Sequence, residues 1–416
     1  MQAVGIIAEY NPFHSGHQWH IGKAKEISGC PFAIVVMSGN FVQRGEPAIF
    51  DKWLRAEMAV SSGADLVIEL PVVFSLRSAQ YFAAGGIRLL KSLGLVSHVS
   101  FGTETDDLPR LKHLAEIIDR PQTGHLLRKL LKNGTTYAAA LSRALQLVQN
   151  GTPYELKSPN DILAVEYLRS LRHFAPDMIP CPVKRQYAQY HDTKIHSPFA
   201  SATAVRLAIL EQPQNPDANL KTVLPKSSQM LIHRAVTEGK GPVTLAGFDS
   251  ILLAKLRLFS LTQLEELPDI TEGLHNKIAE CALHALSLDD LLHQLKSRRY
   301  PRSRLQRILM HALIGTNKQL LSDFDTTGPL YARILAFNHN GRQMLKSLSS
   351  CTAIPLVTKT THFLNSKQRS RGPLSPLQNM LAIDTYASDI YPLAMPNRKW
   401  WFGGRDFCVS PVYLPD

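Results

Sequence analysis

The sequence predicts an α/β fold, in which a doubly wound parallel sheet is followed by a mostly α-helical C-terminal domain. Short apolar runs rich in β-branched residues recur at 3–9, 32–38, 65–70 and 96–101, as expected of parallel strands buried on both faces. Stretches with helical periodicity separate these runs, which is typical of strands joined by crossover helices. After residue 225 the pattern becomes mostly helical.

The first four strands and the helices between them can be placed from their boundary residues. The second strand ends at Gly39, and Asp51 is expected to cap the helix that follows it. Pro71 closes the third strand, and a helix at 79–93 leads into the fourth, which ends at Gly102. Since crossovers of one hand put the loops after parallel strands on one rim, we expect these loops to face a common crevice.

The remaining segments continue this alternation and then leave it. Residues 108–148 are expected to form a helical insertion, and residues 178–183 a further strand. Short strands are also expected at 353–358 and 380–383.

A domain boundary is expected near residue 215. Residues 211–225 contain three prolines and two asparagines, which is typical of a linker. We therefore expect a nucleotide-binding domain at 1–215 and a mostly helical, basic domain at 216–416.

The composition limits the class of protein. The 416 residues carry a formal net charge of +12, which favours a polyanionic partner. The five cysteines are scattered without C-x-x-C spacing, which favours a reducing cytoplasm over a disulfide framework or a zinc site. No apolar run approaches the roughly 20 residues of a membrane span, and the N-terminus lacks the basic region of a signal peptide. We expect a cytoplasmic enzyme with no membrane contact, no protein-held metal and no obligatory protein partner.

His14-Ser15-Gly16-His17 follows the first strand directly and opens a helix. A helix start after a strand presents backbone N–H groups and a positive dipole end to an anion, and two imidazoles can donate to phosphate oxygens. This H-x-G-H pattern belongs to the HIGH-type nucleotidyltransferases and class I aminoacyl-tRNA synthetases. The alternative is an ordinary surface loop, but the position after a buried strand favours nucleotide binding.

Ser201-Ala202-Thr203 with Arg206 forms a second candidate phosphate site. Hydroxyl groups at a helix start, with an arginine one turn later, can clamp phosphate oxygens. The alternative is a plain N-cap followed by an exposed arginine.

Five further residues have both a functional and a structural interpretation. Gly102 either lets a nucleotide pack against the backbone or forms an ordinary turn at the strand end. Asn160 either contacts the edge of a nucleotide base or caps a helix. Arg185 is suited to a phosphate or to the solvated surface, and the loop residue Arg44 to an anionic substrate. Glu9 lies within a buried run, so it is either hydrogen-bonded scaffolding or an orienting group for the loop.

The helical half carries a basic cluster beside a helix with one apolar face. Basic residues backed by an apolar face suit a nucleic-acid backbone, although a charged solvated surface is the alternative. The expected tRNA-binding residues are Lys296, Arg298, Arg299, Arg302, Arg304 and Arg307.

Several blocks together resemble one family, the bacterial tRNA(Met) cytidine acetate ligases, which have a Rossmann-like nucleotidyltransferase domain. The first block reads Gly-Ile-Ile-Ala-Glu-Tyr-Asn-Pro-Phe-His-Ser-Gly-His. The blocks lie at 5–17, 36–48, 65–71, 101–104, 158–160, 183–185 and 201–203. The clamp reads Ser-Ala-Thr, which fits this family but departs from the Ser-Ser-Thr of the wider nucleotidyltransferases.

The resemblance implies an enzyme that activates acetate with ATP and transfers the acetyl group to the wobble cytidine of elongator tRNA(Met), which gives N4-acetylcytidine. It implies ATP contacts at Ile7, Ala8, Glu9, Tyr10, Asn11, Pro12, Phe13, His14, Ser15, Gly16, His17, Gln18, Trp19, His20, Gly102, Asn160 and Arg185.

Adenylation requires the α-phosphate to be held in line and the leaving pyrophosphate to be neutralised. We expect this catalytic work from His14, His17, Ser201, Thr203 and Arg206, with Mg²⁺ assisting. Acetate itself attacks, so no protein nucleophile is needed, and a small apolar pocket near the loop after the second strand is expected to hold it.

Two other classes of function remain open from the sequence. One is a small-molecule adenylyltransferase of the pantetheine or nicotinamide-mononucleotide type, which shares H-x-G-H but needs no basic helical half. The other is a tRNA-binding module without catalysis.

Overall fold

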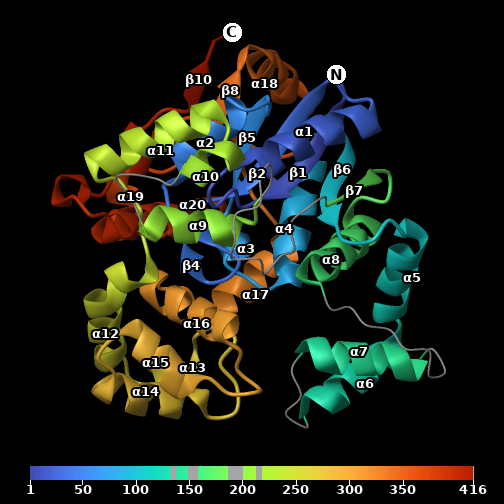
Figure 1. Ribbon diagram of the computed structural model, residues 1–416. Helices are drawn as coiled ribbons and strands as arrows, with labels where there is room; N and C mark the ends of the chain where they lie inside the picture. Colours follow the sequence, from blue (N-terminus) through green and yellow to red (C-terminus); the bar gives the residue numbers. More distant parts are fainter. Residues whose placement is uncertain (133–136, 149–157, 186–199, 212–217, 416) are drawn as a thin grey trace.

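A computed structural model describes residues 1–132, 137–148, 158–185, 200–211 and 218–415. Its centre is an eight-stranded sheet with the order β10-β8-β5-β2-β1-β6-β7, and β9 pairs with β8 (Figure 1). Pairing is parallel except between β5 and β8 in the part of the chain described. The strands are β1 (Ala3–Ala8), β2 (Phe32–Ser38), β5 (Leu66–Leu70), β6 (Val96–Thr103), β7 (Ile179–Lys184), β8 (Ala332–Asn338), β9 (Leu356–Val357) and β10 (Val412–Leu414).

Helices cover both faces of this sheet, so the expected doubly wound α/β fold is confirmed. Alternate strand residues belong to different cores: Ile34 and Val36 face one side, and Val35 and Met37 face the other. One face packs against α3 (Val72–Ser75), α4 (Ala79–Ser92), α8 (Pro159–Phe174), α18 (His339–Cys351) and α20 (Pro376–Ile390). The other packs against α1 (Ser15–Ser28), α2 (Lys52–Val60), α9 (Ala202–Glu211), α10 (Ala218–Val223) and α11 (Lys226–Glu238).

Two groups of helices extend from the sheet in Figure 1. The expected helical insertion is confirmed and consists of α5 (Leu108–Ile118), α6 (Pro121–Lys132) and α7 (Tyr137–Val148). The second group, which we call the helical unit, is α12 (Asp249–Leu258), α13 (Leu261–Glu265), α14 (Leu274–His284), α15 (Leu288–Leu295) and α16 (Arg302–Ile314). No helix of the described residues has the length and apolarity that crossing a bilayer requires.

The C-terminal half returns to the sheet after the helical unit. Its strands β8, β9 and β10 extend the edge beyond β5. In the sequence, α17 (Lys318–Thr327) precedes β8, and α19 (Ser366–Arg371) and α21 (Arg405–Cys408) lie between β9 and β10. The domain boundary near residue 215 stays a prediction, but strands from both halves form one sheet. The expected strand at 353–358 is present as β9, whereas the expected strand at 380–383 is wrong. That segment is the middle of α20, which begins with a Ser375–Gln378 capping box and Pro376.

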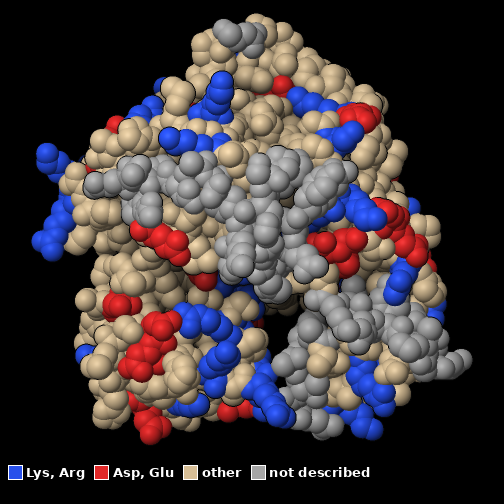
Figure 2. All heavy atoms as spheres, in the orientation of Figure 1, with Lys and Arg blue, Asp and Glu red and all other residues tan. Residues whose placement is uncertain are grey.

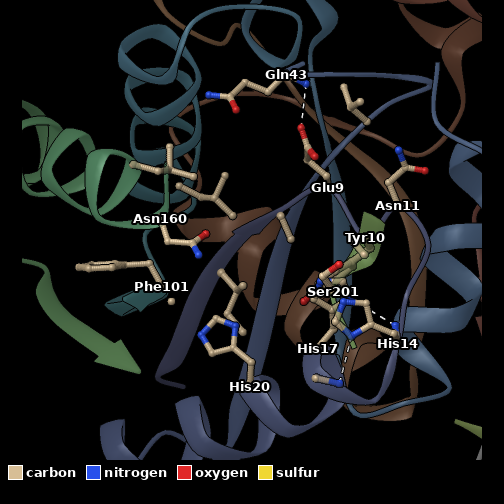
Figure 3. Close-up of a pocket in the computed structure, with 18 of the residues that line it drawn as sticks. Glu9, Tyr10, Asn11, His14, His17, His20, Gln43, Phe101, Asn160 and Ser201 are labelled. Atoms are coloured by element: carbon tan, nitrogen blue, oxygen red, sulfur yellow. Dashed lines mark hydrogen bonds between the residues drawn. The ribbon is translucent and has the colours of Figure 1, made fainter. Parts of the chain in front are cut away.

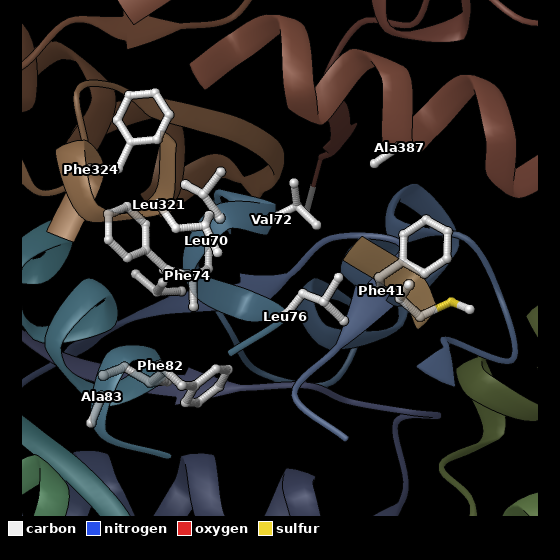
Figure 4. Close-up of a cluster of buried hydrophobic side chains, with 14 of the residues drawn as sticks. Phe41, Leu70, Val72, Phe74, Leu76, Phe82, Ala83, Leu321, Phe324 and Ala387 are labelled. Atoms are coloured by element: carbon white, nitrogen blue, oxygen red, sulfur yellow. The ribbon is translucent and has the colours of Figure 1, made fainter. Parts of the chain in front are cut away.

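The apolar core continues from the N-terminal helices into this C-terminal part. Figure 4 shows Phe74 and Leu70 beside Leu321 and Phe324 of α17, and Phe41 below α20. Phe41 belongs to β3 (Phe41–Val42), which forms a hairpin with β4 (Glu46–Pro47). Burial of these side chains removes apolar surface of both halves from water and so stabilises their association.

A buried charge network also joins the two halves. Lys52 has no exposed side-chain surface and pairs with Glu69 at 2.8 Å and Asp406 at 3.1 Å. Arg333 of β8 pairs with Asp406 at 2.6 Å. Burial by itself raises the pKa of Asp406, but Arg333 and Lys52 outweigh burial and hold that pKa below its usual value. Asp406 is therefore ionised and depends on both cations.

Replacing Lys52 with Met should lower the free energy of unfolding by about 3–5 kcal/mol, because it leaves buried carboxylates short of a cation. Lys23→Met is the matched control, since Lys23 forms an exposed pair with Glu26 whose loss should cost about 0–1 kcal/mol. Urea unfolding followed by circular dichroism measures both. Equal losses in the two variants would show that the buried network is not needed to hold the halves together.

Candidate active site

A cavity of about 270 Å³ lies at the carboxyl ends of β1 and β6. The sheet order changes direction at this point. The strands β2 and β5 lie on one side of β1, whereas β6 and β7 lie on its other side. Ligands bind at such switch points in doubly wound sheets. The loop after β5 was expected to share the crevice but is absent from the described lining. It lies one strand further out, and there Val72 N–H donates to Asp384 at 2.7 Å.

His14 and His17 cap the first helix with their own side chains. Gly16 N–H donates to Nδ1 of His14 at 3.1 Å, and His14 N–H donates to Nδ1 of His17 at 3.3 Å. The two rings stack with their centroids 3.7 Å apart. Because each Nδ1 accepts a backbone proton, each neutral ring carries its own proton on Nε2. Both histidines line the cavity (Figure 3) and are suited to donate N–H to phosphate oxygens.

Burial keeps the cavity histidines neutral. Burial, followed by the charges of Arg185 and Arg206, lowers the pKa of His14 to about 3. Burial and the adjacent His14 hold the pKa of His17 well below its usual value. Burial and Arg185 lower the pKa of His20 to about 4. The charges of Arg185 and Arg206, which disfavour imidazolium, favour an anion, and N–H donors of the cavity would replace the hydration that the anion loses.

The second predicted phosphate site lies against the first. Arg206 donates to the carbonyl of Asn11 at 2.8 Å and to Oγ1 of Thr203 at 3.2 Å. Ser201 accepts the N–H of Ala204 at 3.0 Å, as an N-cap does. Ser201, Thr203 and Arg206 all line the cavity. The serine therefore caps a helix, as the structural interpretation expects, but Arg206 is half-buried at the cavity and not exposed. The phosphate clamp stays a prediction.

Three residues that the sequence analysis singled out separately, Gly102, Asn160 and Arg185, lie close together around Glu104. Asn160 donates to Oε1 of Glu104 at 2.5 Å, and Arg185 lies 3.9 Å from the same oxygen. A Cβ on Gly102 would lie 3.5 Å from the Arg185 side chain. Gly102, Asn160 and Arg185 consequently line one wall of the cavity.

The loop after β1 is held in an unusual conformation. Tyr10 has φ 47°, in the left-handed region that side chains rarely adopt, and such residues cluster at functional sites. Arg55, which is fully buried, donates to the carbonyls of Glu9, Ser38, Gly39 and Phe50. The Glu9 carboxylate accepts Gln43 N–H at 2.8 Å. Glu9 thus joins the loops after β1 and β2, as scaffolding would.

The structure brings most of the predicted nucleotide contacts to the cavity. The lining includes Ile7, Ala8, Glu9, Tyr10, Asn11, His14, Gly16, His17, Trp19 and His20. The other predicted members of this stretch, Pro12, Phe13, Ser15 and Gln18, are not among the described lining residues. Phe13 is fully buried in the core, so its contribution is to packing.

Sequence reasoning missed several apolar lining residues. They are Ile6, Val42, Phe82, Phe101, Leu163 and Tyr167. Each lies in an ordinary apolar run, so no local pattern distinguishes it from a core residue. The flagged loop residue Arg44 does line the cavity, next to Gln43.

The predicted tRNA-binding residues lie outside this cavity, on the helical unit. Lys296, Arg298 and Arg302 are exposed, and Arg302 pairs with Asp289. Figure 2 shows Lys and Arg side chains of this unit bordering a hollow between it and the α6–α7 region.

The other three members of the basic cluster make contacts within the protein, and their role in tRNA binding stays a prediction. Arg299 donates to the carbonyl of Leu131 at 3.3 Å, and Arg304 to that of Asp269 at 2.8 Å. Arg307 is largely buried and donates to the carbonyl of Gln43 at 3.4 Å. Arg307 therefore links the helical unit to the cavity loop.

No group of three or more metal-binding side chains occurs among the residues that the structure describes. Mg²⁺ commonly binds through one or two carboxylates together with substrate phosphates. The donor set of the described cavity therefore fits an Mg²⁺ ion that arrives with a nucleotide better than one caged by protein.

Comparison with known proteins adds an independent line of evidence. The family model described as HIGH Nucleotidyl Transferase matches residues 1–401. The chain is 39% identical to the tRNA(Met) cytidine acetate ligase of Thermoanaerobacter sp. (strain X514), over 99% of each chain. It is 40% identical to the protein of the same name from Caldanaerobacter subterraneus subsp. tengcongensis, over 95% of this chain and 96% of the relative.

Solved structures agree with these sequence relatives. The crystal structure of apo Thermotoga maritima TmcAL matches with a TM-score of 0.92 at 33% identity, over all of both chains. The same protein bound with alpha-thio ATP matches with a TM-score of 0.91 at 32% identity, again over all of both chains.

In the nucleotide-free protein, His14 and His17 should stay neutral, protonated on Nε2, from pH 8 down to pH 5. Nitrogen chemical shifts of labelled histidines, assigned with His14→Gln and His17→Gln, measure this. Because the unfolded chain takes up these protons below about pH 6.5 and the folded chain does not, stability should fall as the pH falls through that range. Titration of either ring near pH 6.5 would contradict the capping arrangement.

Proposed function

Because the chain belongs to the HIGH nucleotidyl transferase family, with tRNA(Met) cytidine acetate ligases as full-length relatives, we propose that it is an ATP-dependent tRNA acetate ligase. It activates acetate as acetyl-adenylate, releases pyrophosphate, and transfers the acetyl group to N4 of the wobble cytidine of elongator tRNA(Met). The observation that carries this proposal is the pair of neutral, Nε2-protonated histidines in the same cavity as Thr203 and Arg206.

The first half-reaction is an in-line displacement at the α-phosphorus of ATP. A carboxylate oxygen of acetate forms the new bond to phosphorus, and the bond to the bridging oxygen of pyrophosphate breaks. Nε2–H groups of His14 and His17 donate to phosphate oxygens as charge builds there, and Arg206 offsets the charge of the leaving group. Gly102, Asn160 and Arg185 hold the nucleoside side of ATP. When bound with the triphosphate, Mg²⁺ would neutralise part of the pyrophosphate charge.

Acetate binds, in this proposal, where the loop after β2 meets the cavity. Val42, Gln43 and Arg44 line the cavity there, and Val42 is almost completely buried. An apolar wall suits the methyl group, and the guanidinium of Arg44 suits the carboxylate. This position agrees with the small apolar pocket expected from the sequence.

The tRNA, in turn, binds along the exposed basic residues of the helical unit and covers the cavity during transfer. Covering the cavity would protect the mixed anhydride from water. Free cysteines among the described residues and a nucleic-acid substrate support a cytoplasmic location for this work.

Incubation with labelled acetate, ATP and bulk tRNA tests the reaction as a whole. Label should appear in tRNA(Met) as N4-acetylcytidine, in amounts matched by the AMP formed. Label transfer to pantetheine or mononucleotide acceptors in place of tRNA would contradict the proposal, and so would tRNA binding without acetate-dependent pyrophosphate release.

His14→Ala should abolish acetate-dependent exchange of pyrophosphate into ATP, by roughly 10²–10³-fold or more for a lost charge-stabilising donor. Affinity for tRNA(Met), measured by filter binding, should change little, because His14 lines the cavity whereas the exposed basic residues lie outside it. Equal losses of exchange and of tRNA affinity would contradict this division of roles.

Replacing both Lys296 and Arg298 with Ala should weaken tRNA binding and reduce the slope of log affinity against log salt by about 1–2, since about one counterion is released per phosphate contact. Acetate-dependent exchange in the absence of tRNA should be unchanged. The matched control is Arg342→Ala with Lys346→Ala, two exposed residues on α18, at the opposite end of the molecule in Figure 1. The same loss of slope in the control would place the tRNA elsewhere.

A further inference from the structure

The second half-reaction needs a proton acceptor that the activation step does not use. The cytosine amine is a weak nucleophile, and it must lose a proton when its nitrogen attacks the acetyl carbon. A group in the cavity has to receive that proton. His14 and His17 are unsuited, because Nδ1 of each ring accepts a backbone N–H and Nε2 already carries hydrogen.

Two carboxylates remain among the described lining residues, Glu9 and Glu46. Glu46 accepts a hydrogen bond from Gln306 of α16 at 3.1 Å, so its side chain is turned toward the helical unit. Glu9 stands at the end of β1, directly before the loop that carries both histidines. In Figure 3 its carboxylate lies on a different side of the cavity from His14, His17 and Ser201.

The Glu9 carboxylate is held by one hydrogen bond from the described residues. The backbone N–H of Gln43 donates to Oε1 of Glu9 at 2.8 Å. That contact holds Oε1 of a residue that is half-buried and lines the cavity. The backbone of Glu9 is equally fixed, since Arg55 holds its carbonyl. A rigid carboxylate at this place repels phosphate and attracts an N–H donor.

The charges around Glu9 come from four elements. Burial raises its pKa, Gln43 N–H, Arg44 and Arg206 act in the opposite direction, and Glu46 raises the pKa again. Tyr167 of α8 is close enough for Glu9 to contribute to the raised pKa of the phenol, after burial. A carboxylate whose pKa is raised toward the working pH is a better base than an ordinary one.

We propose that Glu9 binds the N4 amine of the target cytosine and receives its proton during acetyl transfer, an inference that rests on the proposed function. The N4–carbon bond forms, the carbon–oxygen bond to the phosphate of AMP breaks, and the proton moves from N4 to Oε2 of Glu9 and then to water. The cavity thereby has a donor side, for the phosphate, and an acceptor side, for the nucleophile.

Glu9→Gln separates this role from scaffolding, because a glutamine oxygen can still accept Gln43 N–H but cannot take up the proton. Single-turnover acetyl transfer to tRNA(Met) should fall roughly 10²–10⁴-fold, a much larger loss than that of acetate-dependent pyrophosphate exchange, which reports any contribution of Glu9 to ATP binding. In the original protein the transfer rate should rise with pH as Glu9 ionises, and this rise should vanish in Glu9→Gln. Thermal melting verifies that the variant is folded.

Glu9→Asp is the second variant, since it keeps a carboxylate in a displaced position. It should transfer acetyl more slowly but keep the pH-dependent rise. Transfer by Glu9→Gln at close to the original rate would overturn the inference, as would parallel losses of exchange and transfer or a pH-independent Glu9→Asp. Absence of acetate-dependent exchange in the original protein would instead overturn the proposed function itself.

Discussion

A single buried guanidinium organises the crevice on which the rest of this protein depends. Arg55 of α2 donates to carbonyls at the ends of β1 and β2 and at Phe50. These carbonyls lie at the end of a strand, just after one or just before a helix, where regular backbone partners run out. Burying a charge is costly unless it is fully hydrogen-bonded, and here the arginine and the loop carbonyls satisfy one another. The loops that line the cavity are consequently rigid before any ligand binds.

That rigidity allows opposite electrostatic characters to lie side by side in one small cavity. The side with His14 and His17 presents neutral N–H donors near Arg206, and the side with Glu9 presents a carboxylate. Preorganised donors stabilise developing negative charge without reorganisation. Adenylation and amide formation make opposite demands, one for donors and one for an acceptor. Fixing both groups on one loop after β1 is a compact way to meet them.

The two halves of the chain are joined at the cavity as well as behind it. Lys52 and Arg333 tie the N-terminal strands to the C-terminal ones through shared carboxylates. Gly45 lies against the backbone of α16 with no room for a Cβ, at φ 80°, and Arg307 holds the carbonyl of Gln43. The helical unit therefore contacts the loop that lines the cavity, which connects the proposed tRNA surface to the chemistry.

The sequence by itself determined the features that depend on contiguous residues. Buried strands, the H-x-G-H turn, and the helix start at Ser201 each follow from local spacing, because capping and burial act over a few positions. Tertiary structure alone decided that Arg55 holds the loops, that Arg307 contacts the carbonyl of Gln43, that residues 380–383 are helical, and that β8 pairs antiparallel with β5. These outcomes depend on contacts between residues far apart in the chain. Any apolar or charged residue of suitable size can make such a contact, so the sequence carries no local signal for it.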